Sequence, residues 1–231
     1  MKHELIRRLI LLGVSVPMLS TISCRAASAA VTIPDPTVDT PLASAPGHQM
    51  AVLAGGCFWG IQAVFEHVKG VISATSGYSG GDVPNPGYDL VSSGTTGHAE
   101  SVKIVYDPSQ LTYGQLLKVF FAVAHDPTEL DRQGPDVGSQ YRSAVFYLNA
   151  EQERVANAYI HQLGQAGVFG RPIVTQVTPF TAFYDAEAYH QDYATKHPDN
   201  GYIVVNDAPK VVNLKRELPS LYQVAAAHPQ P

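Results

Sequence analysis

The sequence predicts an α/β domain in which one mixed sheet is covered by helices. Segments with strand-like alternation and segments with helical spacing interleave along the chain. Several connections between them are short, which favours a two-layer α+β arrangement of ferredoxin-like character over an all-parallel sheet. Two other connections are longer than about 12 residues, and loops of that length usually carry a functional site.

The first half of the domain alternates strand and helix signals. In chain order it predicts a strand over residues 50–54, a helix over 58–68, a long loop over 77–87, a strand over 101–106 and a helix over 111–125. The first strand is a short apolar run that ends at two glycines, which favour a tight turn. The first helix carries apolar side chains at intervals of three and four from Phe58 to Val68, and Gly70 stops it.

The second half begins with the second long loop. It predicts that loop over residues 126–141, a strand over 143–148, a helix that follows Asn149, a strand over 173–178, a helix over 185–196 and a last strand over 201–206. Asn149 is a favourable N-cap, and Val155, Tyr159 and Leu163 fall on one face of the helix after it. The last strand is a short apolar run between Gly201 and Asn206.

The two ends of the chain do not resemble the domain. We divide the sequence into a signal peptide over 1–29, a Pro/Ala/Thr-rich linker over 30–48, the domain over 49–222 and a disordered tail over 223–231. The leader has a basic start, a short apolar centre and small residues before the cleavage point, as secretory signals do. We therefore expect export, to the periplasm, after cleavage at Ala29 or with lipid attached to Cys24. Without processing of the leader, the protein would stay cytoplasmic.

Composition narrows the possible functions. Hydrophobic residues make up 45% of the chain and charged residues 15%, as in a globular protein. The formal net charge is −5 and no run of Lys or Arg occurs, which argues against nucleic-acid binding. No cluster of Cys and His has the spacing of metal ligands, and the leader is too short to span a bilayer. We expect a monomer without metal, cofactor or transmembrane span.

The segment "AGGCFWGIQ" carries the residue of greatest chemical interest, Cys57. It follows a predicted strand and two glycines and begins a predicted helix, where backbone N–H groups and the helix dipole favour a thiolate. Free cysteines are often only buried packing. The adjacent pair Phe58 and Trp59 favours a hydrophobic pocket at the sulfur instead. The only other cysteine is Cys24, so a cleaved chain cannot form an internal disulfide.

The motif "GCFWG" resembles the catalytic signature of the A-type peptide methionine sulfoxide reductases. The likeness continues in the same order through "SGYSGG", "YDLVSSGTTGHAE", "HDPTELDRQGPDVGSQYRS" and "FYDAEAYHQDY". It covers essentially the whole domain, from Met50 to Asn206. The resemblance implies repair of oxidised proteins, by thiol-dependent reduction of methionine-S-sulfoxide, free and in proteins, to methionine.

Sulfoxide reduction requires a thiolate, a carboxylic acid that is protonated at neutral pH and a dry pocket for the methyl group. With the resemblance, Cys57 is the nucleophile and Glu100 the general acid, its pKa raised by desolvation. Tyr88 and Tyr141, one in each long-loop region, are expected to donate hydrogen bonds to the sulfoxide oxygen.

Four further residues complete the expected site. Phe58 and Trp59 would hold the methyl group and the thioether chain of the substrate. By resemblance, Asp136 belongs to the catalytic set and orients polar groups or water, and His190 lies near the substrate.

The sequence departs from many members of the family at the recycling step. Those members resolve the sulfenic acid with a second cysteine near the C-terminus, but residues 193–231 contain none. Many also have a cysteine in the segment that matches residues 90–94, where this chain has Ser92. We therefore expect a single-cysteine enzyme that is reduced by an external thiol, such as thioredoxin, a glutaredoxin-like protein or dithiothreitol.

Two alternatives remain open from the residues alone. Cys57 could pair with His98 or His125 in a cysteine hydrolase, although nothing in the sequence fixes that geometry. The domain could also be a non-enzymatic, exported binding module, in which Cys57 would be dispensable.

Overall fold

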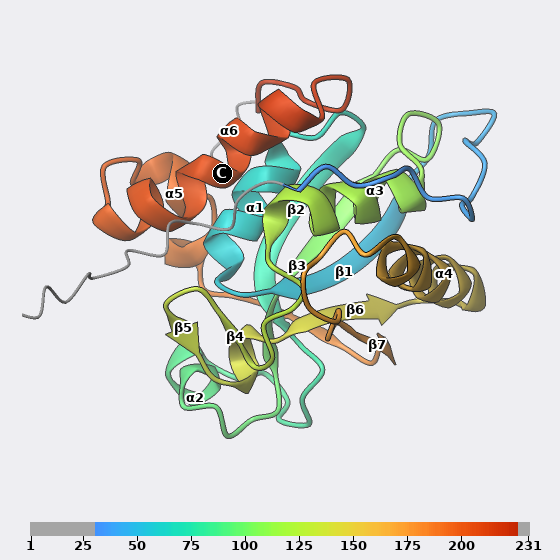
Figure 1. Ribbon diagram of the computed structural model, residues 1–231. Helices are drawn as coiled ribbons and strands as arrows, with labels where there is room; N and C mark the ends of the chain where they lie inside the picture. The colour runs from blue at the N-terminus through green and yellow to red at the C-terminus, as the bar shows by residue number, and fades with distance from the viewer. Residues whose placement is uncertain (1–30, 226–231) are drawn as a thin grey trace, which may run out of the picture.

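The computed structural model describes residues 31–225 (Figure 1). The predicted signal peptide, with its cleavage point and Cys24, lies outside the described residues. Among the described residues, no helix is both long enough and apolar enough to cross a membrane.

The core of the molecule is one six-stranded sheet with the order β7-β6-β1-β3-β2-β8 (Figure 1). Its strands are β1 (Gln49–Gly55), β2 (Val71–Ser79), β3 (Ala99–Tyr106), β6 (Ser143–Tyr147), β7 (Gln176–Pro179) and β8 (Phe183–Asp185). All neighbouring strands are antiparallel except β6 and β7, which are parallel. The expected mixed sheet is confirmed.

The helices are interleaved with these strands. They are α1 (Phe58–Glu66), α2 (Tyr88–Ser92), α3 (Tyr113–Val119), α4 (Ala150–Ala166), α5 (Tyr193–Lys196) and α6 (Ala208–Glu217). The order β1-α1-β2-β3-α3-β6 and the strand positions β6-β1-β3-β2 are those of a ferredoxin-like unit, which also confirms that expectation. Strands β7 and β8 extend this unit at its two edges.

Period-two alternation divides the apolar residues of β1 between two clusters. Ala51 and Leu53 face the large cluster that the helices α1, α3, α4 and α6 complete. Val52 and Ala54 face a smaller cluster with Phe146 on the other side of the sheet. Only residues 56 and 57 separate β1 from α1, so the N-terminus of α1 lies at the end of the central strand β1 (Figure 1).

Helix starts follow the residues that favour them. The Asn149 side chain accepts a hydrogen bond from the Gln152 N–H at 2.9 Å and caps α4, as the sequence predicts. Thr112 and Gln115 form a reciprocal capping box at the start of α3. After Val119 this helix continues as a π-helix over Phe120–Ala124, within the predicted helical span.

The largest error of sequence interpretation is the last predicted strand. Residues 201–206 are helical: a π-helix, η4 (Ile203–Asp207), leads directly into α6. Pro209, in the first turn of α6, is compatible with a helix start because no N–H is needed there. Ile203 is buried while Val204 and Val205 are half exposed, so one helical face, not alternate residues, packs inward.

Three other segments differ from expectation. Strand β2 extends to Ser79, so the first long loop begins later than predicted; Gly77 fits there because the Phe183 ring of β8 occupies the space of a side chain. The predicted helix over 185–196 is broken, since Asp192 has a φ of +55° and only a 3₁₀ turn and α5 are helical. The second long loop contains a short hairpin, β4 (Arg132–Gln133) and β5 (Asp136–Val137).

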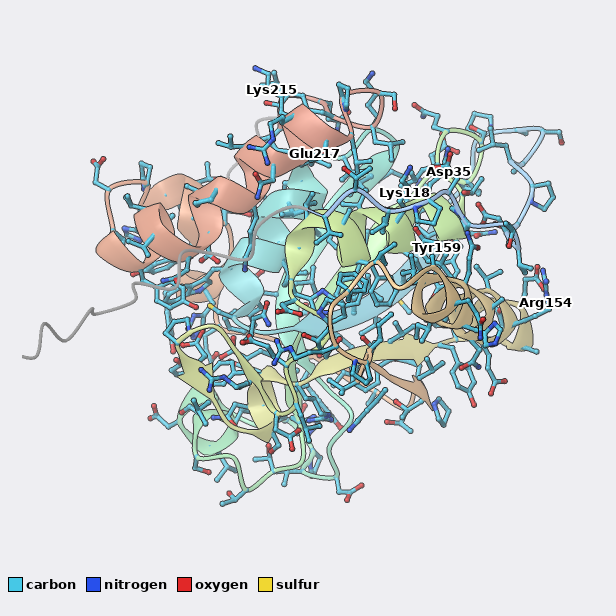
Figure 2. All side chains as sticks on the ribbon, viewed as in Figure 1. Asp35, Lys118, Arg154, Tyr159, Lys215 and Glu217 are labelled. Carbon is cyan, nitrogen blue, oxygen red and sulfur yellow. The ribbon has the colours of Figure 1, made fainter. Side chains whose placement is uncertain are left out.

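Residues 31–48 contain neither helix nor strand, but they are held against the domain by specific contacts. Ile33 is buried, and the Tyr159 hydroxyl of α4 donates a hydrogen bond to the Pro34 carbonyl at 2.7 Å. Lys118 of α3 pairs with Asp35 at 2.6 Å, and both residues lie near Tyr159 in Figure 2. Asp39 accepts the Gly114 N–H at the start of α3. This segment is a strap across α3 and α4.

Candidate active site

The turn between β1 and α1 fixes the position of Cys57. Gly56 has a φ of +96°, and a Cβ built there would lie 2.5 Å from the Cβ of Gln133, so only glycine fits. Cys57 follows as the N-cap of α1 and is 8% exposed. It is the one free cysteine of the described residues.

Gly56→Ala tests how strongly this turn constrains the fold. The left-handed backbone and the clash with Gln133 are expected to cost about 2 kcal/mol of unfolding free energy. Thermal unfolding would then shift down by roughly 4–8 °C. Gly164→Ala is the matched control: Gly164 lies within α4 with nothing within 4 Å, so alanine there is expected to stabilise the helix. An unchanged melting temperature for Gly56→Ala would contradict the argument.

The protonation state of Cys57 differs from the expectation of a stabilised thiolate. Burial raises the pKa of the thiol well above its usual value, and the charges of Glu100 and Asp207 raise it further. The backbone N–H of Trp59 and the Lys210 ammonium lower the pKa of the thiol, but they do not outweigh burial. The N-terminus of α1 lowers the pKa of the thiol, as the sequence predicts, but burial raises it more, so the resting thiol is protonated.

Glu100 lies beside the first turn of α1, at the second position of β3. Its side chain is 2% exposed, and Oε2 accepts the Phe58 N–H at 3.0 Å. Burial raises the pKa of this carboxyl to about 8 in spite of that hydrogen bond, and the charges of Asp136 and Asp207 add to the rise. At pH 7 the carboxyl therefore holds its proton.

Tyr88 and Tyr141 reach the same site from the two long-loop regions. Tyr88 begins α2, and Tyr141 ends a 3₁₀ turn whose Gln140 donates a hydrogen bond to the Ser92 carbonyl of α2 at 3.0 Å. Burial, followed by the charges of Glu100 and Cys57, raises the pKa of Tyr88 to about 12. Burial and the charge of Glu100 also raise the pKa of Tyr141. Both phenols therefore remain hydrogen-bond donors.

Asp136 lies in β5 and accepts a hydrogen bond from the Tyr202 hydroxyl. Burial raises the pKa of Asp136, while Tyr202 and Lys210 oppose the rise. Tyr202 was not predicted as a site residue, because its segment reads as a strand in the sequence. Its ring also meets the Trp59 ring edge-on, with 6.0 Å between centroids.

An aromatic wall surrounds the first turn of α1. The Trp59 indole stacks on Tyr193 with 3.8 Å between ring centroids and donates its N–H to Nδ1 of His190 at 3.1 Å. His190 is 2% exposed and also contacts the rings of Phe58 and Tyr88, at centroid distances of 5.0 and 4.5 Å. Because Nδ1 accepts the hydrogen bond from the indole N–H, it carries no proton, and His190 orients the indole as a neutral ring.

Glu187 supports the wall from behind and was also missed. It accepts the Tyr78 hydroxyl at 2.8 Å and the Tyr88 N–H at 2.8 Å. These two contacts join β2, α2 and the segment that carries His190. The sequence contains no spacing signal for Glu187, since its two partners are about 100 residues away in the chain.

Neither of the two histidines proposed for a cysteine hydrolase, His98 and His125, forms a hydrogen bond with Cys57. His98 bonds the Gly81 N–H and the Val83 carbonyl through its two ring nitrogens. His125 bonds the Phe120 carbonyl and the Ser143 hydroxyl, and burial lowers its pKa to about 3. A thiolate–imidazole pair is therefore not formed with either ring.

Residues 49–220 match the family described as peptide methionine sulfoxide reductase. The chain belongs to this family. Peptide methionine sulfoxide reductase MsrA 2 of Mesorhizobium japonicum is 56% identical to this reductase over 179 residues, which are 78% of this chain and 92% of the relative. MsrA 2 of Synechocystis sp. is 51% identical over 187 residues, 80% of this chain and 87% of the relative. The reduced form of Mxr1 from Saccharomyces cerevisiae is 32% identical, with a TM-score of 0.60 over 72% of this chain and 93% of that one.

The reaction follows from this membership. The protein is a peptide-methionine (S)-S-oxide reductase, and the predicted family and activity are confirmed. The alternative of a non-enzymatic binding module is thereby wrong. The structure brings the eight predicted site residues to one end of the sheet, around the first turn of α1.

Proposed function

We propose that Cys57 attacks the sulfoxide sulfur while Glu100 protonates the sulfoxide oxygen. One observation carries this assignment: a buried carboxyl with a pKa of about 8 is hydrogen-bonded to the backbone N–H of the residue after the cysteine. An acid held at that place is within reach of an oxygen on the sulfur that Cys57 attacks. Sulfoxide oxygen leaves poorly unless it is protonated, so the acid and the nucleophile must act together.

In the first stage, the Cys57 thiol loses its proton and its sulfur bonds to the substrate sulfur. Glu100 gives its proton to the oxygen and takes up the proton released by the thiol. The hydroxyl then passes to Cys57 and the thioether leaves. The net change is Cys–SH plus sulfoxide to Cys–SOH plus thioether, in which Cys57 is oxidised by two electrons and the substrate sulfur is reduced by two.

The remaining residues bind the substrate in this proposal. Tyr88 and Tyr141, both protonated donors, bind the sulfoxide oxygen and stabilise the charge that develops on it. Phe58 and Trp59 hold the S-methyl group and exclude water. Asp136 fixes the Tyr202 hydroxyl at the edge of the indole. The substrates are methionine-S-sulfoxide in oxidised proteins and as the free amino acid.

We further propose that an external thiol restores Cys57. The described residues contain no second cysteine, and the sequence has none after Cys57. A thiol condenses with Cys–SOH to give a mixed disulfide and water, and a second thiol releases Cys57 as its reduced form. A thioredoxin- or glutaredoxin-like protein, whose two thiols are adjacent, supplies both steps.

Mass spectrometry after one turnover without reductant tests this recycling route. We expect one added oxygen on Cys57, about +16 in mass, or a single adduct when a small thiol is present. Cys24→Ser is the matched control, and it should leave the result unchanged. A disulfide between Cys57 and Cys24, seen as a loss of two hydrogens, would contradict an external route.

Export is a separate proposal that rests on residues 1–29. The basic, apolar and small-residue regions of this leader are those of a secretory signal. Fractionation of producing cells and mass analysis of the mature chain test it. A soluble periplasmic chain that begins at Ala30 supports cleavage, a lipid mass on Cys24 supports anchoring, and an intact cytoplasmic chain contradicts both.

A further inference from the structure

A buried ion pair lies next to the active site and has no role in the steps above. Lys210 Nζ of α6 is 3.1 Å from Oδ1 of Asp207, and the two side chains are 6% and 0% exposed. Isolated buried charges are costly, so a pair in this position needs a reason beyond stability. Oδ2 of Asp207 has no hydrogen-bond partner among the described residues, which leaves one carboxylate oxygen unsatisfied.

Gly60 makes room for this pair against the first turn of α1. A Cβ built on Gly60 would lie 2.1 Å from Asp207 Oδ1 and 2.7 Å from Lys210 Nζ. Cys57 precedes Gly60 by three residues, and positions i and i+3 share one face of a helix. The charged pair therefore fills the space that a side chain at Gly60 would occupy, on the helix face that carries the thiol.

The charges of the pair act on Cys57 in opposite directions. Lys210 lowers the pKa of the thiol, whereas Asp207 and Glu100 raise it. The charge of Lys210 also lowers the pKa values of Asp136, His125 and Asp207. The other titratable groups that face Cys57 are the phenols of Tyr88, Tyr141 and Tyr202, which are neutral donors.

We propose that Lys210 is a positioning residue that stabilises the thiolate of Cys57 as its proton leaves, and that Asp207 holds the ammonium group in the space left by Gly60. This inference rests on Cys57 as the nucleophile of the proposed function. Lys210 supplies a positive charge that offsets the negative charge of Asp207 near the sulfur. Asp207 holds the ammonium group in a buried position near Cys57, although its own negative charge raises the pKa of the thiol.

The test measures the reactivity of Cys57 rather than turnover. The rate of Cys57 alkylation by iodoacetamide follows the thiolate fraction, so its dependence on pH reports the thiol pKa. We expect Lys210→Met to lower the rate at pH 7 by about tenfold and Asp207→Asn to raise it by a similar factor, the size of one pKa unit each. Asp207→Asn/Lys210→Met is expected to lie between the two.

Lys215→Met is the matched control, since it removes one positive charge from the same helix. Lys215 is exposed and stands at the outer side of α6, away from the body of the protein (Figure 2). Its alkylation profile is expected to match the wild type. Circular dichroism checks the fold of each variant, and if Lys210→Met does not fold, the double variant is compared with Asp207→Asn to isolate the effect of Lys210.

Opposite shifts separate this proposal from a merely structural role. Loosened packing around Cys57 would expose the sulfur and raise the alkylation rate in both single variants. A Lys210→Met profile equal to the wild type, or shifted in the same direction as that of Asp207→Asn, overturns the proposal. The turnover of Cys57→Ser is measured separately and tests the identity of the nucleophile, so the two failures are distinguishable.

Discussion

Cys57→Ser is expected to lower kcat/KM for methionine-S-sulfoxide by about 10³-fold or more. A serine hydroxyl is a far weaker nucleophile than a thiolate. Its oxygen also cannot donate the two electrons that reduce the substrate sulfur, as the cysteine sulfur does when it becomes a sulfenic acid. The exchange changes one atom at a buried N-cap, so the fold is expected to persist. Turnover with dithiothreitol as the reductant measures the effect independently of any partner protein.

Cys24→Ser is the control for this variant, because Cys24 is the only other cysteine of the chain. It is expected to keep wild-type activity with dithiothreitol. A melting temperature of Cys57→Ser equal to that of the wild type shows that the loss of activity comes from the missing thiol and not from unfolding. More than about one per cent residual activity would be incompatible with Cys57 as the nucleophile.

Glu100→Gln is expected to lower kcat by about 10²- to 10⁴-fold, the usual contribution of a general acid. The amide keeps the shape of the carboxyl and can still accept the Phe58 N–H, so the first turn of α1 is expected to be undisturbed. The amide cannot release a proton to the sulfoxide oxygen. Because the acid must be protonated, wild-type kcat/KM is expected to fall as pH rises through about 8.

His98→Ala is the comparison for Glu100→Gln, because His98 is bound to backbone groups and not to Cys57. It is expected to change stability more than chemistry. The residual activity of Glu100→Gln is expected to lack the decline through pH 8. A variant that keeps both the wild-type rate and the same decline would show that another group supplies the proton.

The raised pKa of Glu100 also links folding to pH. The folded carboxyl has a pKa of about 8, compared with about 4.3 in an unfolded chain, so the folded state binds more protons between these values. The contribution to stability is fully present below the unfolded pKa and is lost as pH rises through the folded pKa. Denaturant unfolding is therefore expected to show Glu100→Gln gaining stability relative to the wild type from pH 5 to pH 8.

Local sequence signals were sufficient for much of the fold. The glycine turn before Cys57, the apolar spacing of α1 and the Asn149 cap each specify structure within a few residues. They could not specify η4, where the β-branched run after Tyr202 has strand propensity but packs as a helix against α1. Tertiary contacts decide such segments.

The same error hid part of the site. On a helix, residues three apart such as Asp207 and Lys210 face the same side and can form a pair. On a strand followed by a loop, the same spacing does not predict a contact between them. The sequence also placed the thiol correctly at a helix start but gave no measure of its burial. The carboxyl groups that raise its pKa come from β3 and η4, far away in the chain.

The covered, protonated state of Cys57 has a consequence for survival among oxidants. Oxidation of cysteine by peroxide follows exposure and thiolate character, and the resting site limits both. In the mechanism proposed above, a sulfoxide differs from a peroxide because its methyl group binds against the aromatic wall and its oxygen takes a proton from Glu100. On this mechanism, Cys57 is expected to react faster with methionine sulfoxide, the product of oxidative damage, than with the peroxide that causes the damage.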